Sequence, residues 1–200
     1  MWVSDAGVVS HLVNRVYEVS EHGDRYARVA AGFSARVDRI APDQWDAPTP
    51  CPLWTVRDLV GHVVAVHRAI LAGEDVTPAP SPADDADLAA AWQRATGDLT
   101  TALADPDRAA APVAGRFAPM PFEQLVGMLG CFDTLVHTWD LARAIGVDER
   151  LDTAAVTFSF DALRPNDDAI RGAGGYGPKL EPPPGADEQT RFLAFLGRRV

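Results

Sequence analysis

Two histidines and one aspartate carry the chemistry that the sequence offers most clearly. Asp133 and His137 stand four residues apart in the run 131–140, so on a helix they share one face, with Cβ atoms about 6 Å apart. His62 lies in the apolar run 60–64. One carboxylate and two imidazoles can hold a divalent cation and leave a coordination position open, as in catalytic zinc sites. The same ligands also suit nickel, iron and manganese.

Spacing alone leaves a second interpretation open. A single buried histidine is more often a hydrogen-bonded core residue than a metal ligand, and an aspartate four residues before a histidine can form a simple ion pair. The apolar neighbours favour a cation, because a charged aspartate that faces the interior needs a partner to offset its desolvation. At this point the residues leave two interpretations open: a divalent-metal site at His62, Asp133 and His137, with zinc as the first choice, and a core histidine beside an ordinary ion pair.

Three polar residues near these ligands have weaker roles. His67 lies five residues beyond His62, about 140° around a helix, which predicts a position at the surface or behind the ligands. Asp58 falls in a first helical turn, where an acid caps the helix. Asp140 lies three residues after His137 and is either an acceptor for the ligand imidazole or a capped surface residue.

The other reactive or bulky side chains receive structural interpretations. Cys51 and Cys131 form no CxxC motif and are predicted to be free thiols. Cys51 precedes a predicted helix whose dipole could activate it, but no matching His–Asn pair accompanies it. Arg57 and Arg143 could hold an anion, yet helix arginines are more often solvated. The tryptophans are core residues first and pocket lining second, namely Trp54, Trp92 and Trp139. The sequence assigns no catalytic residue.

Amphipathic segments with helical period are expected to position the ligands. The predicted helices cover residues 21–40, 55–73, 87–103 and 122–145. Thr55 with Asp58 three residues later predicts a helix start, and Gly73 and Gly146 are placed to end helices. Proline-rich links separate the segments at 42–54, 74–84 and 109–121. The pattern predicts a mainly α, up-and-down four-helix bundle.

The chain is expected to divide into three parts. Residues 1–20 form an N-terminal extension, residues 21–146 the metal-binding bundle, and residues 147–200 a C-terminal extension packed on the bundle. The last part contains predicted helices at 152–163 and 187–197 and a glycine-rich turn at 172–177.

Composition excludes several classes of partner. The chain has 200 residues, 47% of them hydrophobic, and a formal net charge of −10, which argues against nucleic acid and anionic membrane surfaces, since both are bound through clustered lysine and arginine. No segment approaches the roughly 18 apolar residues of a membrane span, and the N-terminus lacks a basic opening before an apolar stretch. We expect a cytoplasmic protein.

Several motifs together resemble the DinB/YfiT-like superfamily of metal-binding bundles, and more narrowly its mycothiol-dependent maleylpyruvate isomerase branch. The resemblance runs from about Tyr26 to Arg198. It rests on a Pro-Asp-Gln-Trp run that ends at Trp45 and on the segments 49–62, 133–142, 177–178 and 195–198. It implies His62, Asp133 and His137 as metal ligands. The isomerase is similar but uses a glutamate where this chain has Asp133, one methylene shorter, which leaves the reaction open.

The resemblance also implies a class of reaction. Related enzymes bind and ionise a low-molecular-weight thiol, such as mycothiol or bacillithiol, at the metal. Our first hypothesis is a metal-dependent transferase or isomerase that activates a small thiol for attack on an electrophile. The alternatives are a binding or sensing bundle with a structural or regulatory metal, and an interaction bundle whose site has decayed. The sequence is compatible with a homodimer but does not determine the oligomeric state.

Overall fold

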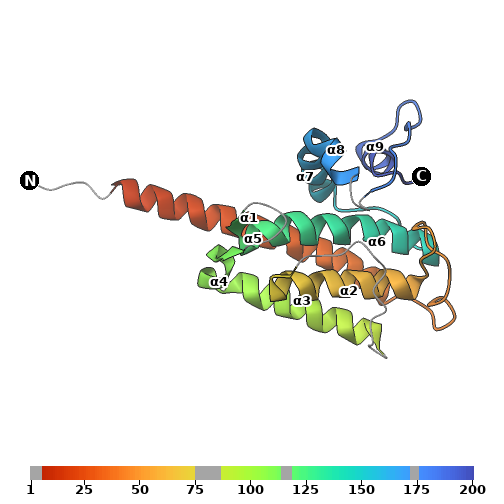
Figure 1. The fold of residues 1–200 in the computed structure, drawn as a ribbon, viewed down its shortest axis with the longest axis horizontal. Coiled ribbons are helices and arrows are strands. Elements are labelled where there is room, and N and C mark those ends of the chain that lie inside the picture. Colours follow the sequence, from red (N-terminus) through yellow and green to blue (C-terminus); the bar gives the residue numbers. More distant parts are fainter. Residues whose placement is uncertain (1–5, 75–86, 114–118, 172–175) are drawn as a thin grey trace, which may run out of the picture.

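The computed structural model describes residues 6–74, 87–113, 119–171 and 176–200, with side chains from residue 21 onward apart from Ala169. Within these residues, long helical segments pack side by side as a bundle (Figure 1). The segments are α1 (Ala6–Val37), α2 (Val56–Ala72), α3 (Leu88–Ala104) and a fourth made of α5 (Phe122–Leu125), η1 (Val126–Gly130) and α6 (Cys131–Ile145). The predicted mainly α bundle is confirmed.

The helices follow one another around the bundle in the order α1, α6, α2, α3, and α3 returns to pack on α1. The Tyr26 hydroxyl lies 2.9 Å from Thr96 Oγ1, and Trp92 Nε1 donates to Ser34 Oγ at 2.9 Å, so α1 and α3 are antiparallel. α1 and α6 run in one direction and α2 and α3 in the other (Figure 1). The directions are therefore up, down, down, up rather than strictly alternating, and residues 73–87 supply the long connection that parallel neighbours need.

The local signals that begin and end α2 act as the sequence predicts. The Thr55 hydroxyl accepts from the Asp58 amide at 3.2 Å, while Asp58 Oδ2 accepts from the Thr55 amide at 2.9 Å, a reciprocal capping box. Asp58 Oδ2 also accepts from the Thr55 hydroxyl at 2.6 Å, and this hydrogen bond, followed by the one from the Thr55 amide, lowers the pKa of Asp58. Asp58 is confirmed as a capping residue. Gly73 (φ 72°) and Gly146 (φ 73°) end α2 and α6 in the left-handed conformation that favours glycine.

Two helices differ from their expected form. α1 begins at Ala6 rather than near residue 21 and ends at Val37, so part of the predicted N-terminal extension continues this helix. In the fourth helix, η1 is a π-helical segment, with wider i→i+5 hydrogen bonding inside an otherwise α-helical stretch. Gly127 in η1 permits a close approach of α1, because a Cβ there would lie 2.3 Å from His22 Nδ1.

Smaller elements complete the described chain. α4 (Pro106–Ala110) follows α3, and β1 (Pro112–Val113) pairs antiparallel with β2 (Met120–Pro121). α7 (Thr153–Leu163) packs on α6 and on α9 (Glu188–Phe195), with η2 (Arg164–Asn166) and α8 (Asp167–Arg171) between them (Figure 1). Most of the predicted link at 74–84 and of the turn at 172–177 lies outside the described residues. The division into three parts stays a prediction.

The core of the bundle is apolar and aromatic. Trp92 and Trp139 are fully buried, as are Phe33 and Phe122, which confirms the two tryptophans as core residues. Among the described residues, no helix is both long and apolar enough to cross a membrane.

Candidate metal centre

The structure brings the three predicted ligands together between α2 and α6. Asp133 Oδ1 lies 3.0 Å from His62 Nε2 and 3.5 Å from His137 Nε2, and one ligand atom from each residue lies within 4.8 Å of the others. Two ligands bound to one tetrahedral zinc at about 2.0–2.1 Å lie roughly 3.3 Å apart. The side chains are therefore spaced so that small adjustments would accommodate one ion.

Asp133 has an incomplete set of partners. Its Oδ2 is buried, and among the described residues nothing hydrogen-bonds to it. Burial alone would raise the pKa of Asp133, but the neighbouring His62 and His137 lower it overall, which keeps a negative charge beside two ring nitrogens. A buried carboxylate oxygen without a partner is costly, and a cation is the kind of group that would satisfy it.

His137 is held in one orientation by Asp140. The Asp140 carboxylate is fully buried, and its Oδ2 lies 3.1 Å from His137 Nδ1. Because a carboxylate only accepts, Nδ1 carries a proton, and on metal binding Nε2, which faces Asp133, would present its lone pair to the ion. Of the two predicted roles for Asp140, the acceptor role fits the structure and the surface position is wrong.

Cys51, Asp140 and Arg198 form a second group, here called the Asp140 cluster. Asp140 Oδ2 accepts from Cys51 Sγ at 3.2 Å and from Arg198 Nη2 at 2.8 Å, and Oδ1 accepts from Arg198 Nε at 3.1 Å. Burial would raise the pKa of Asp140, but Arg198 and His137 lower it to about 2. Burial, with the Asp140 charge, raises the pKa of the Cys51 thiol, which agrees with a buried, unreactive thiol.

Cys51, His137 and Asp140 also have spacing suitable for a metal. The Arg198 guanidinium already binds both oxygens of this carboxylate and lies 3.5 Å from the sulfur. A second cation there would meet like charge in a buried setting. The metal-ligand cluster of His62, Asp133 and His137 is thus the better candidate.

Trp54 covers the metal-ligand cluster. Its ring lies 4.8 Å from the His62 ring, centroid to centroid, and stacks 5.8 Å from the His137 ring with an interplanar angle of 23°. Trp54 thus lines the site and, partly buried, also packs against the hydrophobic core. The residue before it, Leu53, is fully exposed and has a φ of 68°, a conformation that leucine rarely adopts.

Comparison with known proteins places this geometry in a family. Residues 26–142 match the model of the family described as Mycothiol maleylpyruvate isomerase N-terminal domain. The chain belongs to this family, part of the DinB-like superfamily. Two uncharacterised proteins of Mycobacterium tuberculosis, from strains CDC 1551 / Oshkosh and H37Rv, are each 31% identical over 184 residues, covering 88% of this chain and 96% of their own length. No solved structure matches the chain.

The segment matched to the Mycothiol maleylpyruvate isomerase N-terminal domain contains all three candidate ligands and Asp140, whereas Arg198 lies beyond it. Tyr176 also lies beyond it. Burial, and then the charge of Asp133, raise the pKa of the Tyr176 hydroxyl. Sequence reasoning gave neither residue a role, although Gly177 and Arg198 stood in motifs of the resemblance.

His67 is buried, so the expected surface position is wrong. Its Nδ1 donates to the Val63 carbonyl at 2.8 Å, and its ring packs edge-on against Trp92 at 4.9 Å. α2 contacts both α3 and α6, so a rotation of about 140° from His62 still faces the bundle interior. Burial lowers the pKa of His67 to about 4, which keeps the ring neutral near pH 7.

The two candidate anion-binding arginines pair elsewhere at the surface. Arg57 Nε lies 3.7 Å from Asp46, and Arg143 donates twice to Glu149, at 2.9 and 2.7 Å. Both agree with the expectation of solvated helix arginines.

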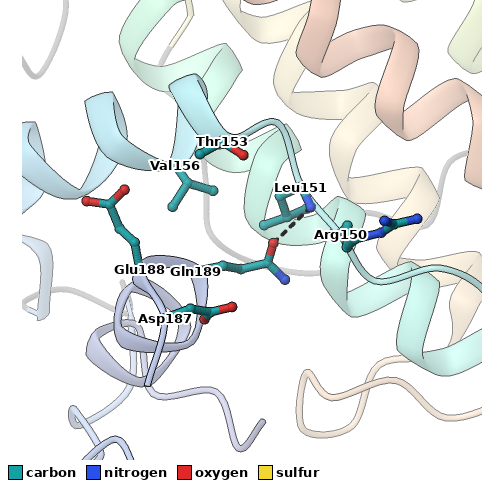
Figure 2. A pocket seen from close by; sticks show the side chains of 7 residues that line it. All are labelled: Arg150, Leu151, Thr153, Val156, Asp187, Glu188 and Gln189. Atoms are coloured by element: carbon teal, nitrogen blue, oxygen red, sulfur yellow. Dashed lines mark hydrogen bonds between the residues drawn. The ribbon is translucent and has the colours of Figure 1, made fainter. Parts of the chain in front are cut away.

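A pocket of about 260 Å³ lies between the start of α7 and the start of α9 (Figure 2). Inside it, the Leu151 amide donates to Gln189 Oε1 at 2.9 Å. Five of its seven lining residues are polar or charged and none is a ligand residue: Arg150, Leu151, Thr153, Val156, Asp187, Glu188 and Gln189. The chemistry of the metal-ligand cluster therefore does not extend to it.

Proposed function

We propose that this protein binds one divalent metal ion, zinc in the first place, through His62, Asp133 and His137. The observation that supports this most directly is Asp133 Oδ2, a buried carboxylate oxygen with no hydrogen-bond partner among the described residues. The 3.0 and 3.5 Å separations from Asp133 Oδ1 to the two imidazoles add to it, as does membership of a DinB-like family. Nickel, iron and manganese suit the same ligands.

We further propose that the protein is a cytoplasmic transferase or isomerase that uses a small thiol of the mycothiol type against an electrophilic substrate. The family name supports the choice of thiol. A bound divalent metal would lower the pKa of such a thiol so that it ionises near neutral pH. The chain's own residues supply orientation and exclusion of water: Asp140 fixes the His137 ring, and Trp54 covers both imidazoles.

A second candidate function is metal binding without catalysis, as a structural or regulatory site. The observation that favours it is the limited access to the cluster, since the His62 and His137 side chains are only 5% and 8% exposed and Asp133 16%. A small thiol needs an open coordination position, whereas a structural ion is enclosed by its ligands. The two functions thus differ in whether an outside ligand can reach the ion.

The test begins with metal content. Untagged wild type, His137→Ala and the surface control Arg143→Gln are purified without chelator, loaded with zinc and analysed for bound metal. We expect about one ion per chain in wild type and Arg143→Gln and none in His137→Ala. A wild type that holds no zinc, nickel, iron or manganese would overturn the proposal.

Cobalt substitution then separates the two functions. If mycothiol reaches the ion, adding it to the cobalt protein produces a thiolate-to-metal charge-transfer band. A transferase then consumes mycothiol with an electrophile, whereas an isomerase isomerises maleylpyruvate and releases mycothiol unchanged. An unchanged spectrum would favour the structural or regulatory site.

A further inference from the structure

Arg198, near the C-terminal end, reaches the back of the candidate centre. Its Nε donates to Asp140 Oδ1 at 3.1 Å and its Nη2 to Asp140 Oδ2 at 2.8 Å. The guanidinium therefore holds both carboxylate oxygens with the paired geometry that arginine provides and lysine does not. The Arg198 side chain is 14% exposed and the Asp140 side chain fully buried.

Asp140 transmits this constraint to a ligand. The oxygen that accepts from Arg198 Nη2 also accepts from His137 Nδ1 at 3.1 Å. Without the guanidinium, the Asp140 carboxylate could rotate away from the ring, and His137 would lose the acceptor that fixes its tautomer and orientation. Acceptors of this kind typically change metal affinity by 10- to 100-fold.

The end of α9 aims Arg198 at this place. The Gly197 amide donates to the Ala194 carbonyl at 3.0 Å and the Arg198 amide to the Leu193 carbonyl at 2.9 Å, the hydrogen bonds of a Schellman turn. Gly197 has a φ of 81°, and a Cβ there would lie 2.9 Å from the Pro178 carbonyl oxygen. Only glycine fits both the left-handed backbone and this close approach.

We propose that Arg198 is a positioning residue of the metal centre, which acts through Asp140 on His137. The C-terminal segment then completes a centre whose ligands all lie in α2 and α6. This inference rests on the proposed metal site. It assigns Arg198 to the support of a ligand rather than to a substrate, because both Asp140 oxygens already occupy its guanidinium.

The first experiment measures zinc affinity by competition with a chromophoric chelator. Arg198→Gln is expected to bind zinc 10- to 100-fold more weakly than wild type. Arg198→Lys should recover part of the loss, because it restores the charge but not the paired hydrogen bonds. Arg199→Gln is the matched control, since it removes the same charge from the exposed neighbouring residue, and its affinity should equal that of wild type.

A double-mutant cycle tests whether the effect passes through Asp140. In an Asp140→Asn background, Arg198→Gln should weaken zinc binding by less than about twofold, because the group that it positions has already been altered. If the two losses multiply in full, Arg198 does not act through Asp140 and the proposal is wrong.

Gly197→Ala perturbs the position of Arg198 while keeping its guanidinium. It should also weaken zinc binding, whereas Gly146→Ala should not, because Gly146 has a similar φ of 73° but a Cβ there would meet nothing within 4 Å among the described residues. This pair also covers the case in which Arg198→Gln fails to fold. Equal zinc affinity in Gly197→Ala and Gly146→Ala would contradict the proposed positioning.

Failure of the metal proposal is distinguishable from failure of this one. If wild type binds no metal, the proposed function fails, and ¹⁵N NMR of the His137 ring in metal-free protein decides the role of Arg198. At a pH where the ring is neutral, wild type should show the Nδ1-protonated tautomer, and Arg198→Gln a mixture of tautomers. An unchanged ring spectrum in folded Arg198→Gln would overturn the assignment.

Discussion

Two buried groups of similar composition meet at His137, and they differ in how their carboxylates are satisfied. In the metal-ligand cluster, Asp133 Oδ1 faces two imidazoles while Oδ2 has no hydrogen-bond partner among the described residues. In the Asp140 cluster, both oxygens accept from Arg198, and Oδ2 also accepts from Cys51. The two aspartates are seven residues apart on α6.

This difference in hydrogen bonding distinguishes Asp133, the candidate metal ligand, from Asp140, which supports the ligand His137. Both aspartates lie within the spacing of a metal site from His137, so residue type and distance alone do not choose between them. The guanidinium of Arg198 neutralises Asp140 and leaves no net charge to attract a cation, whereas Asp133 keeps a negative charge and an unused oxygen. The number of carboxylate oxygens that already have partners, rather than the number of candidate ligands, favours the metal-ligand cluster as the metal site.

The largest expected effect comes from exchanging each aspartate for asparagine. Asp133→Asn should weaken zinc binding by at least about 100-fold, because it removes a charged ligand, yet change the stability of the metal-free protein by less than about 1 kcal/mol. Asp140→Asn should weaken zinc binding by about 10- to 100-fold but destabilise the metal-free protein by about 3 to 5 kcal/mol, because buried Arg198 loses its counter-ion. Chelator competition and urea unfolding in EDTA measure the two quantities.

The two variants are thus expected to rank in opposite orders for loss of zinc affinity and for loss of stability, and each order can contradict the comparison. If Asp140→Asn loses more zinc affinity than Asp133→Asn, Asp140 is the ligand and the assignment of the two clusters is reversed. If Asp133→Asn is the more destabilised metal-free protein, Asp133 is an ordinary buried ion-pair residue.

The next largest expected effect is the pH dependence of stability that His67, a histidine outside both clusters, causes. His67 titrates near 6.5 when unfolded and at about 4 when folded, so the unfolded chain takes up the proton first as pH falls. The stability that His67 contributes is complete above pH 6.5 and is lost between pH 6.5 and about 4, by about 3 kcal/mol in total. The free energy of unfolding in urea, measured in EDTA across this range, gives the value.

His67→Gln is the matched variant because its side chain stays neutral at all these pH values. Its stability should fall less steeply than that of wild type, and the gap between the curves isolates His67 because His62 and His137 are present in both. Parallel curves would show that the His67 ring is not held neutral by the core.

The sequence predicted features that depend on neighbouring residues. The capping box of Thr55 and Asp58 and the glycine ends at Gly73 and Gly146 follow from hydrogen bonds within a few residues. The pairing of Asp133 with His137 follows from the four-residue helical period, and the apolar run around His62, together with the resemblance, indicated His62 as their neighbour in space. That these residues hold a metal stays a prediction.

Features that depend on the packing of distant segments escaped prediction. Helical period places His67 away from His62 but does not reveal that α2 is covered on that side too. Arg198 lies 58 residues from Asp140, and no spacing rule links an arginine after one helix to an aspartate within another. The parallel course of α2 and α3 and the π-helical segment η1 depend likewise on contacts between helices.

The smallest expected effect concerns the loop that covers the metal-ligand cluster. Leu53 is fully exposed with a φ of 68°, so leucine bears a backbone cost there without an apolar contact in return. Leu53→Gly should raise the free energy of unfolding by about 0.5 to 1 kcal/mol, because glycine adopts this conformation without strain. Leu53→Ala keeps a Cβ and should stay within about 0.5 kcal/mol of wild type.

Zinc affinity and thiol turnover of the Leu53 variants test whether leucine at this position serves the function of the site. Trp54 contacts both imidazoles, while Cys51 in the same loop contacts Asp140, so the loop borders both clusters. If both Leu53 variants keep wild-type zinc affinity but lose thiol turnover, the exposed leucine contributes to the access of the thiol to the metal-ligand cluster. If the glycine variant is less stable than the alanine variant, the backbone at Leu53 is not strained. The Asp140 cluster alone would then maintain the conformation of the loop.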